Sequence, residues 1–367
     1  MSISCPKCGS ENTKRNGGGR LHCFDCRRSS YVNPDSGELR PIPDGFKAKG
    51  VSTFVGPDGS IKAQWIKTTA DEARQREIFE AATEAMAAEL PRVAPVKASG
   101  EYLAKLLTVY PIGDPHVGMY SWREETGDDW DLAIAEDTHV RAMASLVESA
   151  PASESALIVN LGDLFHYDSL EAKTPASGHM LDADGRYAKM VAVGVKTMRQ
   201  CIESALAKHK RVHVINAPGN HDPTGALWLS IALANVYERE PRVTIDRNPS
   251  LFSYYRHGKV LLGVHHGHSC KADKLPGVMA ADRAKDWGES EYRYWLTGHI
   301  HHESRKEYAG VTVESFGTLA AKDAYATNGG WRSSRNMQAV VYHADMGECA
   351  RAKVHAEMFR DLARAAA

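Results

Sequence analysis

Cysteines and histidines in short, repeated spacings are the residues of this sequence most able to do chemistry. Two Cys-x-x-Cys pairs lie near the start of the chain, and fourteen residues separate them. Each pair can present two thiolates from one tight turn, and four thiolates complete the closed tetrahedral shell of a structural zinc ion. We therefore predict one structural Zn²⁺, bound by Cys5, Cys8, Cys23 and Cys26.

The segment around these cysteines is basic, although the whole chain has a formal net charge of -1. Such a local excess of basic side chains suits contacts to a phosphate backbone. We predict DNA contacts from five of them: Lys14, Arg15, Arg20, Arg27 and Arg28. The segment resembles the zinc ribbons of transposase-type and other DNA-handling proteins. The alternative is a folding staple or a protein-docking module, because zinc ribbons serve in these ways too.

Five short polar motifs follow strand-like apolar runs further along the chain. They are Asp-Pro-His at 114–116, Gly-Asp at 162–163, Gly-Asn-His-Asp at 219–222, His-His-Gly-His at 265–268 and Gly-His-Ile-His at 298–301. Their carboxylates, amide and imidazoles are suitable donors for two hydrolytic metal ions, which a shared carboxylate can bridge. We expect the backbone at Asp-x-His and His-x-His to bend out of strand geometry so that both side chains reach one cluster.

The order of these motifs resembles that of the calcineurin-like metallophosphoesterases, over about residues 105 to 320. The resemblance implies a β-sandwich flanked by helices, which is a four-layer α-β-β-α arrangement. The ligands that it implies fall into three groups: Asp114, His116 and His301 for one ion; Asn220, His266 and His299 for the other; and Asp163 as the bridge. His265 is a second candidate for the ligand at His266, and we favour His266 because His266-Gly-His268 matches the family's His-Gly-His.

The same resemblance implies a role for His221 outside the metal ligands, steadying the phosphate or protonating the leaving oxygen, with Asp222 orienting it. In the mechanism that it implies, the two ions lower the pKa of a bridging water, and the resulting hydroxide attacks phosphorus in line. We expect two divalent ions, with Mn²⁺ as the leading candidate and Fe or Zn²⁺ as alternatives.

The run Gly-Asp-Leu-Phe-His at 162–166 resembles that of the SbcD-type and Mre-type DNA repair nucleases, where this histidine helps engage the DNA phosphate. His166 is therefore a predicted catalytic residue, and the alternative is that it caps the following loop. We predict a DNA phosphodiesterase, either an exo- or an endonuclease. A phosphomonoesterase or small-molecule phosphodiesterase with a structural ribbon is the alternative. A DNA-binding or scaffold protein with a relict site is disfavoured, because the ligand set is intact.

Aromatic side chains near these loops are candidates for stacking on bases, with packing as the equally common alternative. The four candidates are Trp122, Trp130, Tyr167 and Tyr187. The predicted partner is DNA, and no signature ties the chain to an SbcC-type ATPase. A zinc ribbon on a compact nuclease would suit a phage or mobile element.

The elements that must position these residues follow from periodicity. We predict a zinc ribbon over 1–35, a linker with a hairpin (51–67) and a helix (69–90) over 36–100, a catalytic domain over 101–346, and a helical tail over 347–367. Strand-like runs alternate with helical segments from residue 101, which predicts an α/β layered fold. The strands after about residue 250 follow one another closely, which predicts a partly antiparallel region.

The composition, with 43% hydrophobic and 25% charged residues, is that of a soluble globular protein. No apolar run has the length of a membrane span, and the first residues lack the order of a signal peptide. We therefore expect a cytoplasmic protein with no membrane partner. Three cysteines outside the zinc ribbon are scattered singly, which is poor material for a disulfide framework.

Overall fold

The computed structural model describes residues 4–5, 7–16, 20–26, 29–31, 46–55, 61–70, 93–95 and 101–360. The chain divides into two compact units, Met1–Ala85 and Met86–Ala367, and each is described by itself. None of the described helices combines the length and the apolar character that crossing a membrane requires.

The first unit contains two small antiparallel sheets. Strands β1 (Thr13–Asn16), β2 (Arg20–Cys23) and β3 (Ser29–Tyr31) form one of them in that order. Strands β4 (Phe46–Val55) and β5 (Ile61–Ala70) form the other. The predicted hairpin is confirmed and is longer than the sequence indicated. The helix predicted over 69–90 overlaps β5 at its start, and the rest of that range lies outside the described residues.

A six-stranded sheet carries the first three motifs of the second unit. Its order is β16-β15-β6-β7-β8-β9. Four neighbouring strands of the sheet are parallel: β6 (Leu103–Ile112), β7 (Ser153–Asn160), β8 (Arg211–Asn216) and β9 (Val243–Ile245). Strand β15 (Asn336–His343) pairs antiparallel with β6. The central strands are buried on both faces, which explains their nearly continuous apolar runs.

A five-stranded sheet carries the other two motifs, in the order β10-β11-β12-β14-β13. Strands β11 (Val260–Val264), β12 (Tyr292–Thr297) and β14 (Val311–Ser315) are parallel. The edge strands β10 (Ser253–His257) and β13 (Ser304–Tyr308) are antiparallel to their neighbours. One apolar core joins the two sheets, with Leu157 and Val340 from the first and Leu262 and Leu296 from the second. The predicted mixture of parallel and antiparallel strands is confirmed.

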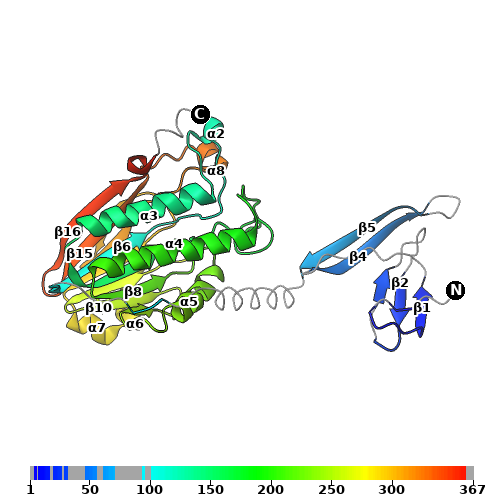
Figure 1. The fold of residues 1–367 in the computed structure, drawn as a ribbon, viewed down its shortest axis with the longest axis horizontal. Helices are drawn as coiled ribbons and strands as arrows, with labels where there is room; N and C mark the ends of the chain where they lie inside the picture. The colour runs from blue at the N-terminus through cyan, green and yellow to red at the C-terminus, as the bar shows by residue number, and fades with distance from the viewer. Residues whose placement is uncertain are drawn as a thin grey trace. The chain divides into compact units, whose positions relative to one another are not determined.

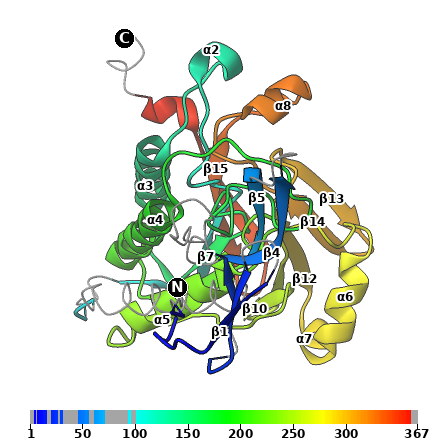
Figure 2. The same ribbon diagram turned by 90° about the vertical axis from the view of Figure 1, so that its right-hand side faces the viewer.

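Helices cover both outer faces of this sandwich. Figures 1 and 2 show α3 (Leu132–Ser149) and α4 (Tyr187–Lys208) side by side on one side of the strands, and α5 (Gly225–Val236) packs on β8. On the opposite side lie α6 (Leu275–Asp282) and α7 (Ala284–Glu289) (Figure 2). Met279 of α6 packs with the buried Trp295 of β12. The predicted four-layer α-β-β-α arrangement is confirmed.

The C-terminal segment differs from the predicted helical tail. Residues Gly347–His355 form strand β16, which pairs antiparallel with β15, and a single 3-10 turn, η1 (Ala356–Phe359), follows. Local Ala/Arg-rich composition favours a helix, but pairing with β15 supplies ladder hydrogen bonds that outweigh this weak preference. The six-stranded sheet therefore extends past residue 346, the predicted end of the catalytic domain, and residues 361–367 lie outside the described part.

Candidate metal centres

The predicted ligands all lie just past the carboxyl ends of parallel strands. Asp114 follows β6, Asp163 follows β7 and Asn220 follows β8, and these strands are neighbours in the first sheet. His266 follows β11 and His299 follows β12, which are neighbours in the second sheet. Since the sheets face each other, the loops from both meet at one edge of the sandwich, as ligand sites in α/β folds commonly do.

The backbone at five of the predicted ligands adopts the left-handed conformation that side-chain-bearing residues rarely use. The φ angles are 46° at Asp114, 43° at His116, 53° at Asp163, 72° at His299 and 55° at His301. Among the other non-glycine residues in the described ranges, only Ala309 has a positive φ. Such conformations cost on the order of 1–3 kcal/mol each and persist at functional sites where the surroundings hold them. The predicted departure from strand geometry is confirmed.

Hydrogen bonds and close glycines hold the loop at Asp114. The backbone N–H of His299 donates to the Asp114 carboxylate at 3.0 Å, and the Thr318 hydroxyl donates to the Asp114 carbonyl at 2.7 Å. A Cβ at Gly298 would lie 2.6 Å from Asp114 Oδ2, so only glycine permits this approach. Thr318 carries no motif in the sequence, and only its place in the fold reveals its contact with the ligand loop.

Asp222 holds the loop at Asp163, which is a different role from the one predicted. Its buried carboxylate accepts backbone N–H bonds from Asp163 at 3.0 Å, Phe165 at 3.1 Å and Gly219 at 3.1 Å. The ring of His221 is instead oriented by its Nδ1, which donates to the His166 carbonyl at 2.7 Å. The prediction that Asp222 orients His221 is therefore corrected: its carboxylate is directed at backbone groups that the sequence pattern could not identify.

The first ligand group brings together Asp114, His116 and His301. His116 Nε2 and His301 Nε2 lie 3.1 Å apart, and His301 Nε2 lies 3.4 Å from Asp114 Oδ1. The ligand atoms of the three residues all lie within 4.8 Å of one another. The Asp114 and His116 side chains are buried, whereas that of His301 is 41% exposed, so this group opens to solvent on the side of His301.

The second group brings together Asp163, His266, His299 and Asn220. His266 Nε2 lies 3.2 Å from Asp163 Oδ2 and 3.0 Å from Asn220 Oδ1, and the ligand atoms of Asp163, His266 and His299 cluster within 4.8 Å. His266 Nδ1 donates to the Leu161 carbonyl at 2.8 Å, which directs Nε2 into the group. Between the adjacent histidines, the structure thus places His266 in the cluster.

His265 lies elsewhere. Its ring stacks on Phe252 at 4.7 Å, and its Nε2 is 3.0 Å from the Ser269 hydroxyl.

The donor spacing fits divalent metal ions. Metal–nitrogen and metal–oxygen bonds of about 2.0–2.2 Å place neighbouring ligands roughly 3 to 3.5 Å apart, and the contacts in both groups fall in this range. Burial lowers the pKa of His266, but the Asp163 carboxylate outweighs it and raises the pKa to about 10. A cation can take the place of this proton, since buried carboxylates require a positive partner.

His166 lies behind the ligands rather than at the surface. Its side chain is 1% exposed, its Nδ1 lies 3.2 Å from His116 Nδ1, and its ring stacks on that of His221 at 5.5 Å. Burial lowers the pKa of His166 to about 3, so the ring is neutral at pH 7. This arrangement supports neither the loop cap nor a direct contact with a DNA phosphate. It supports a positioning role, in which His166 fixes the ring of His116.

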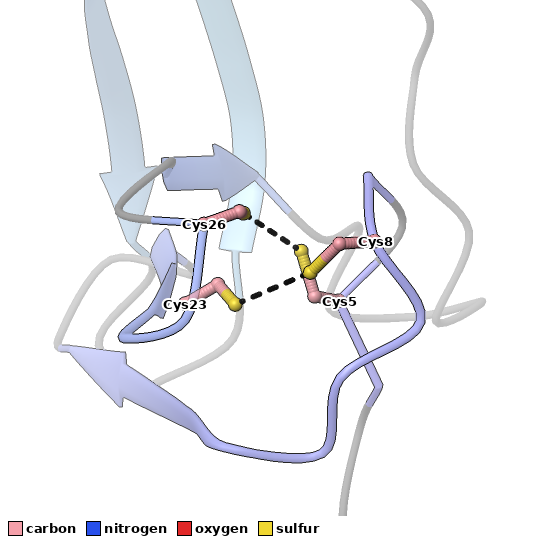
Figure 3. Close-up of side chains that lie close together, drawn as sticks. All are labelled: Cys5, Cys8, Cys23 and Cys26. Atoms are coloured by element: carbon pink, nitrogen blue, oxygen red, sulfur yellow. Dashed lines mark hydrogen bonds between the residues drawn. The ribbon is translucent and has the colours of Figure 1, made fainter.

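The four N-terminal cysteines form a separate cluster (Figure 3). The Sγ atoms of Cys5 and Cys26 lie 3.6 Å apart, as do those of Cys8 and Cys23, and all four lie within 4.8 Å. Tetrahedral bonds of about 2.3 Å would place sulfurs roughly 3.8 Å apart, so the spacing fits one zinc ion. The backbone N–H of Lys7 lies 3.4 Å from Cys5 Sγ and lowers the pKa of this thiol to about 7, which favours the ligating thiolate.

The basic residues predicted to contact DNA are only partly described. Lys14 is exposed on β1, and the backbones of Arg15 and Arg20 belong to the paired strands β1 and β2. Arg27 and Arg28 lie outside the described residues. Their contact with DNA stays a prediction.

Comparisons with known proteins leave the family of this chain undefined. No model of a known protein family matches it, and a search of curated proteins finds no match.

Solved structures give low similarities. A predicted phosphoesterase from Streptococcus pneumoniae TIGR4 is 11% identical over 68% of this chain and 98% of its own, with a TM-score of 0.28. Vps29 from Entamoeba histolytica, complexed with zinc, is 12% identical over 68% and 99%, with a TM-score of 0.30. A putative 5'-nucleotidase from Staphylococcus aureus is 10% identical over 68% and 54%, with a TM-score of 0.32. Likenesses at this level assign neither a family nor a substrate.

Proposed function

We propose that the chain is a dinuclear metal-dependent phosphodiesterase that acts on DNA as an exo- or endonuclease. The observation that carries the proposal is the convergence of two carboxylates, an amide and four imidazoles at one edge of the sandwich, with left-handed backbone at five of these seven residues. Two ligand groups that each contain a carboxylate, with Asp163 proposed as the bridge, are the arrangement expected of a two-metal hydrolytic centre. Mn²⁺ is the proposed metal, with Fe or Zn²⁺ as alternatives.

Bound divalent ions would supply Lewis-acid polarisation of the phosphate and acidification of water. The chain's own residues would hold these ions and orient the ligand loops. Asp163, the proposed bridge, has one carboxylate oxygen facing His266 of the second group, and its other oxygen accepts the backbone N–H of His221 at 2.8 Å. Asp222 fixes the Asp163 loop through backbone N–H groups.

His221 is the group in this proposal that steadies the phosphate or moves a proton to the leaving oxygen. Its Nδ1–H donates to the His166 carbonyl, which fixes the ring and leaves Nε2 as the atom for these tasks. The ring lies beside that of His116, with centroids 4.9 Å apart, and its side chain is only partly buried. A phosphate oxygen near the ligand groups would therefore be within its reach.

The preference for DNA rests on the first unit. Four clustered thiols beside the exposed Lys14 agree with a zinc ribbon that contacts a phosphate backbone. Removal of residues 1–35 should weaken DNA binding and reduce its salt dependence, while hydrolysis of a small diester changes little. Equal salt slopes with and without the segment would count against a DNA role and favour a structural ribbon.

Hydrolysis assays with added Mn²⁺ test the function directly. The substrates are single-stranded DNA, double-stranded DNA, bis(p-nitrophenyl) phosphate and p-nitrophenyl phosphate. The proposal predicts cleavage of DNA and of the diester, with a slower reaction on the monoester. If DNA stayed intact while the monoester was hydrolysed rapidly, the nuclease proposal would be wrong and the alternative, a phosphomonoesterase, would be supported.

A further inference from the structure

Exposed aromatic side chains gather on two loops of the second unit. Among the described residues, four of the five aromatic side chains that are strongly exposed belong to these loops: Tyr120 (47%), Trp122 (54%), Tyr325 (73%) and Trp331 (56%). Of the four stacking candidates from the sequence, Trp122 is the one in this set, whereas Trp130 and Tyr167 are buried. Clustered exposed aromatics usually mark a binding surface.

The two loops are adjacent in the fold. Trp122 precedes α2 (Arg123–Thr126), and Tyr325 lies in α8 (Ala324–Asn328). Both views show α2 and α8 next to each other at one end of the unit (Figures 1 and 2). The buried Ser121 hydroxyl donates to the Lys322 carbonyl at 2.7 Å, and this bond ties the two loops together.

Both loops are also fastened to the ligand loops. Tyr120 lies four residues after His116, at most about 14 Å along an extended chain, and a turn closed by Met119 N–H and the His116 carbonyl makes the span shorter. On the other side, Thr318 donates to the Asp114 carbonyl, four residues before Lys322. Hydrogen bonds therefore tie the backbone of both loops to the loops that carry the candidate metal ligands.

A hollow of about 190 Å³ lies between the two loops. Tyr120, Trp122 and Ala324 line it together with the acidic residues Glu125 and Asp182. This volume is below the roughly 300–1,000 Å³ of sites for drug-sized ligands, so it suits one planar ring system better than a whole nucleotide. The negative charge of these two residues disfavours a phosphate there, and an acidic side chain accepts hydrogen bonds from donors such as the amino group of a base.

We infer that this hollow, here called the aromatic rim (Tyr120, Trp122, Glu125, Asp182 and Ala324), binds a nucleobase of the substrate whose phosphate lies at the metal ligands. The inference rests on the proposed function, and it names a nucleobase-bearing ester as the substrate class. Stacking on aromatic side chains tolerates any base and is worth about 1–3 kcal/mol per base. A base in a strand and the base of a free nucleotide share this chemistry.

Binding to matched oligonucleotides tests the rim. Dissociation constants are measured for the full chain in an Asp163→Asn background, which blocks hydrolysis, with a single-stranded oligonucleotide and with an abasic strand of equal length. Trp122→Ala should weaken binding of the base-containing strand about 5- to 150-fold and leave the abasic strand unchanged. Trp122→Phe should restore most of the loss. Met346→Ala, an equally exposed apolar change outside the rim, should have no effect.

Equal weakening for both strands, or none for either, would overturn the inference. Competition by a nucleoside monophosphate that Trp122→Ala abolishes would assign the rim to free nucleotides as well, and lack of competition would assign it to the strand. Hydrolysis by the unsubstituted chain separates the two claims. Cleavage of DNA together with base-independent binding would contradict the nucleobase site and leave the proposed function standing. Base-dependent binding without hydrolysis of any ester would contradict the proposed function and leave the nucleobase site standing.

Discussion

The Cys-rich sheet of the first unit and the strand ends of the second unit gather metal-binding side chains by different means. Four cysteines from two short turns form the first cluster, and all four ligand atoms are alike. Residues from five separate strand ends form the second, with carboxylate, amide and imidazole donors and five left-handed backbone positions. A thiolate shell saturates tetrahedral zinc, whereas mixed donors around an exposed edge leave room for substrate.

The difference shows where each region gets its order. A small Cys-rich unit has little apolar core, so we expect its fold to depend on a bound ion. The strained loops of the second unit are held by a large two-sheet core and by Asp222 and Thr318. Substitutions in each region test this difference.

Cys23→Ser should remove the ion from the first unit and unfold its small sheet. Structural zinc contributes on the order of 10–16 kcal/mol in such units, and Cys23 is buried against Cys8. Zinc analysis should show one equivalent less, and hydrogen exchange should show loss of protection in β1 and β2. Small-diester hydrolysis should stay within about twofold, as should every readout in Cys349→Ser. Unchanged zinc content would contradict the closed site.

Asp222→Asn should lower the Mn²⁺ affinity and the free energy of unfolding of the second unit, although Asp222 is not a predicted metal ligand. An amide cannot accept all three backbone N–H bonds, and leaving buried donors unsatisfied costs about 1–3 kcal/mol. Mn²⁺ affinity should fall about 10- to 100-fold, as for other groups that orient ligands. Metal titration and urea unfolding measure both effects. Asp137→Asn, on the exposed face of α3, is the control. Equal effects in the two variants would contradict the role of Asp222 in holding the Asp163 loop.

His166→Gln should lower kcat/KM by about 10- to 100-fold on DNA and on a small diester alike, because His166 acts through His116. Mn²⁺ affinity should fall with it, while the melting temperature changes little. A loss confined to DNA, with metal affinity intact, would instead return His166 to direct phosphate contact.

Acid should lower the free energy of unfolding of the second unit. Burial lowers the pKa of His139 and of His209 to about 4, below the unfolded value of about 6.5. The stability due to the neutral rings is therefore complete above pH 6.5 and is lost as the pH falls toward 4. Each histidine should contribute up to about 1.4 kcal/mol per pH unit. Urea unfolding at several pH values between 7.5 and 5 measures the free energy of unfolding. This free energy should fall less steeply with decreasing pH in His209→Gln than in the exposed control His355→Gln.

The sequence predicts most of the site because metal ligands must be particular residue types at strand ends. The layered fold followed from strand and helix periodicity, and the departure from strand geometry at Asp114-x-His116 and His299-x-His301 followed from the need for convergence. The sequence could not predict β16, since pairing with β15 overrides local composition. Nor could it predict the contacts of Asp222 and Thr318, because their partners are backbone groups brought close only by the fold.

The most direct test of the two-metal centre is metal content measured together with diester hydrolysis, for the unsubstituted chain and for Asp163→Asn. The unsubstituted chain should bind two Mn²⁺ ions in addition to one zinc ion. Asp163→Asn should retain the zinc, lose at least one Mn²⁺ and hydrolyse bis(p-nitrophenyl) phosphate about 10³-fold more slowly, since a bridged pair supplies several kcal/mol. Retention of both Mn²⁺ ions, with activity within tenfold of the unsubstituted chain, would contradict the account.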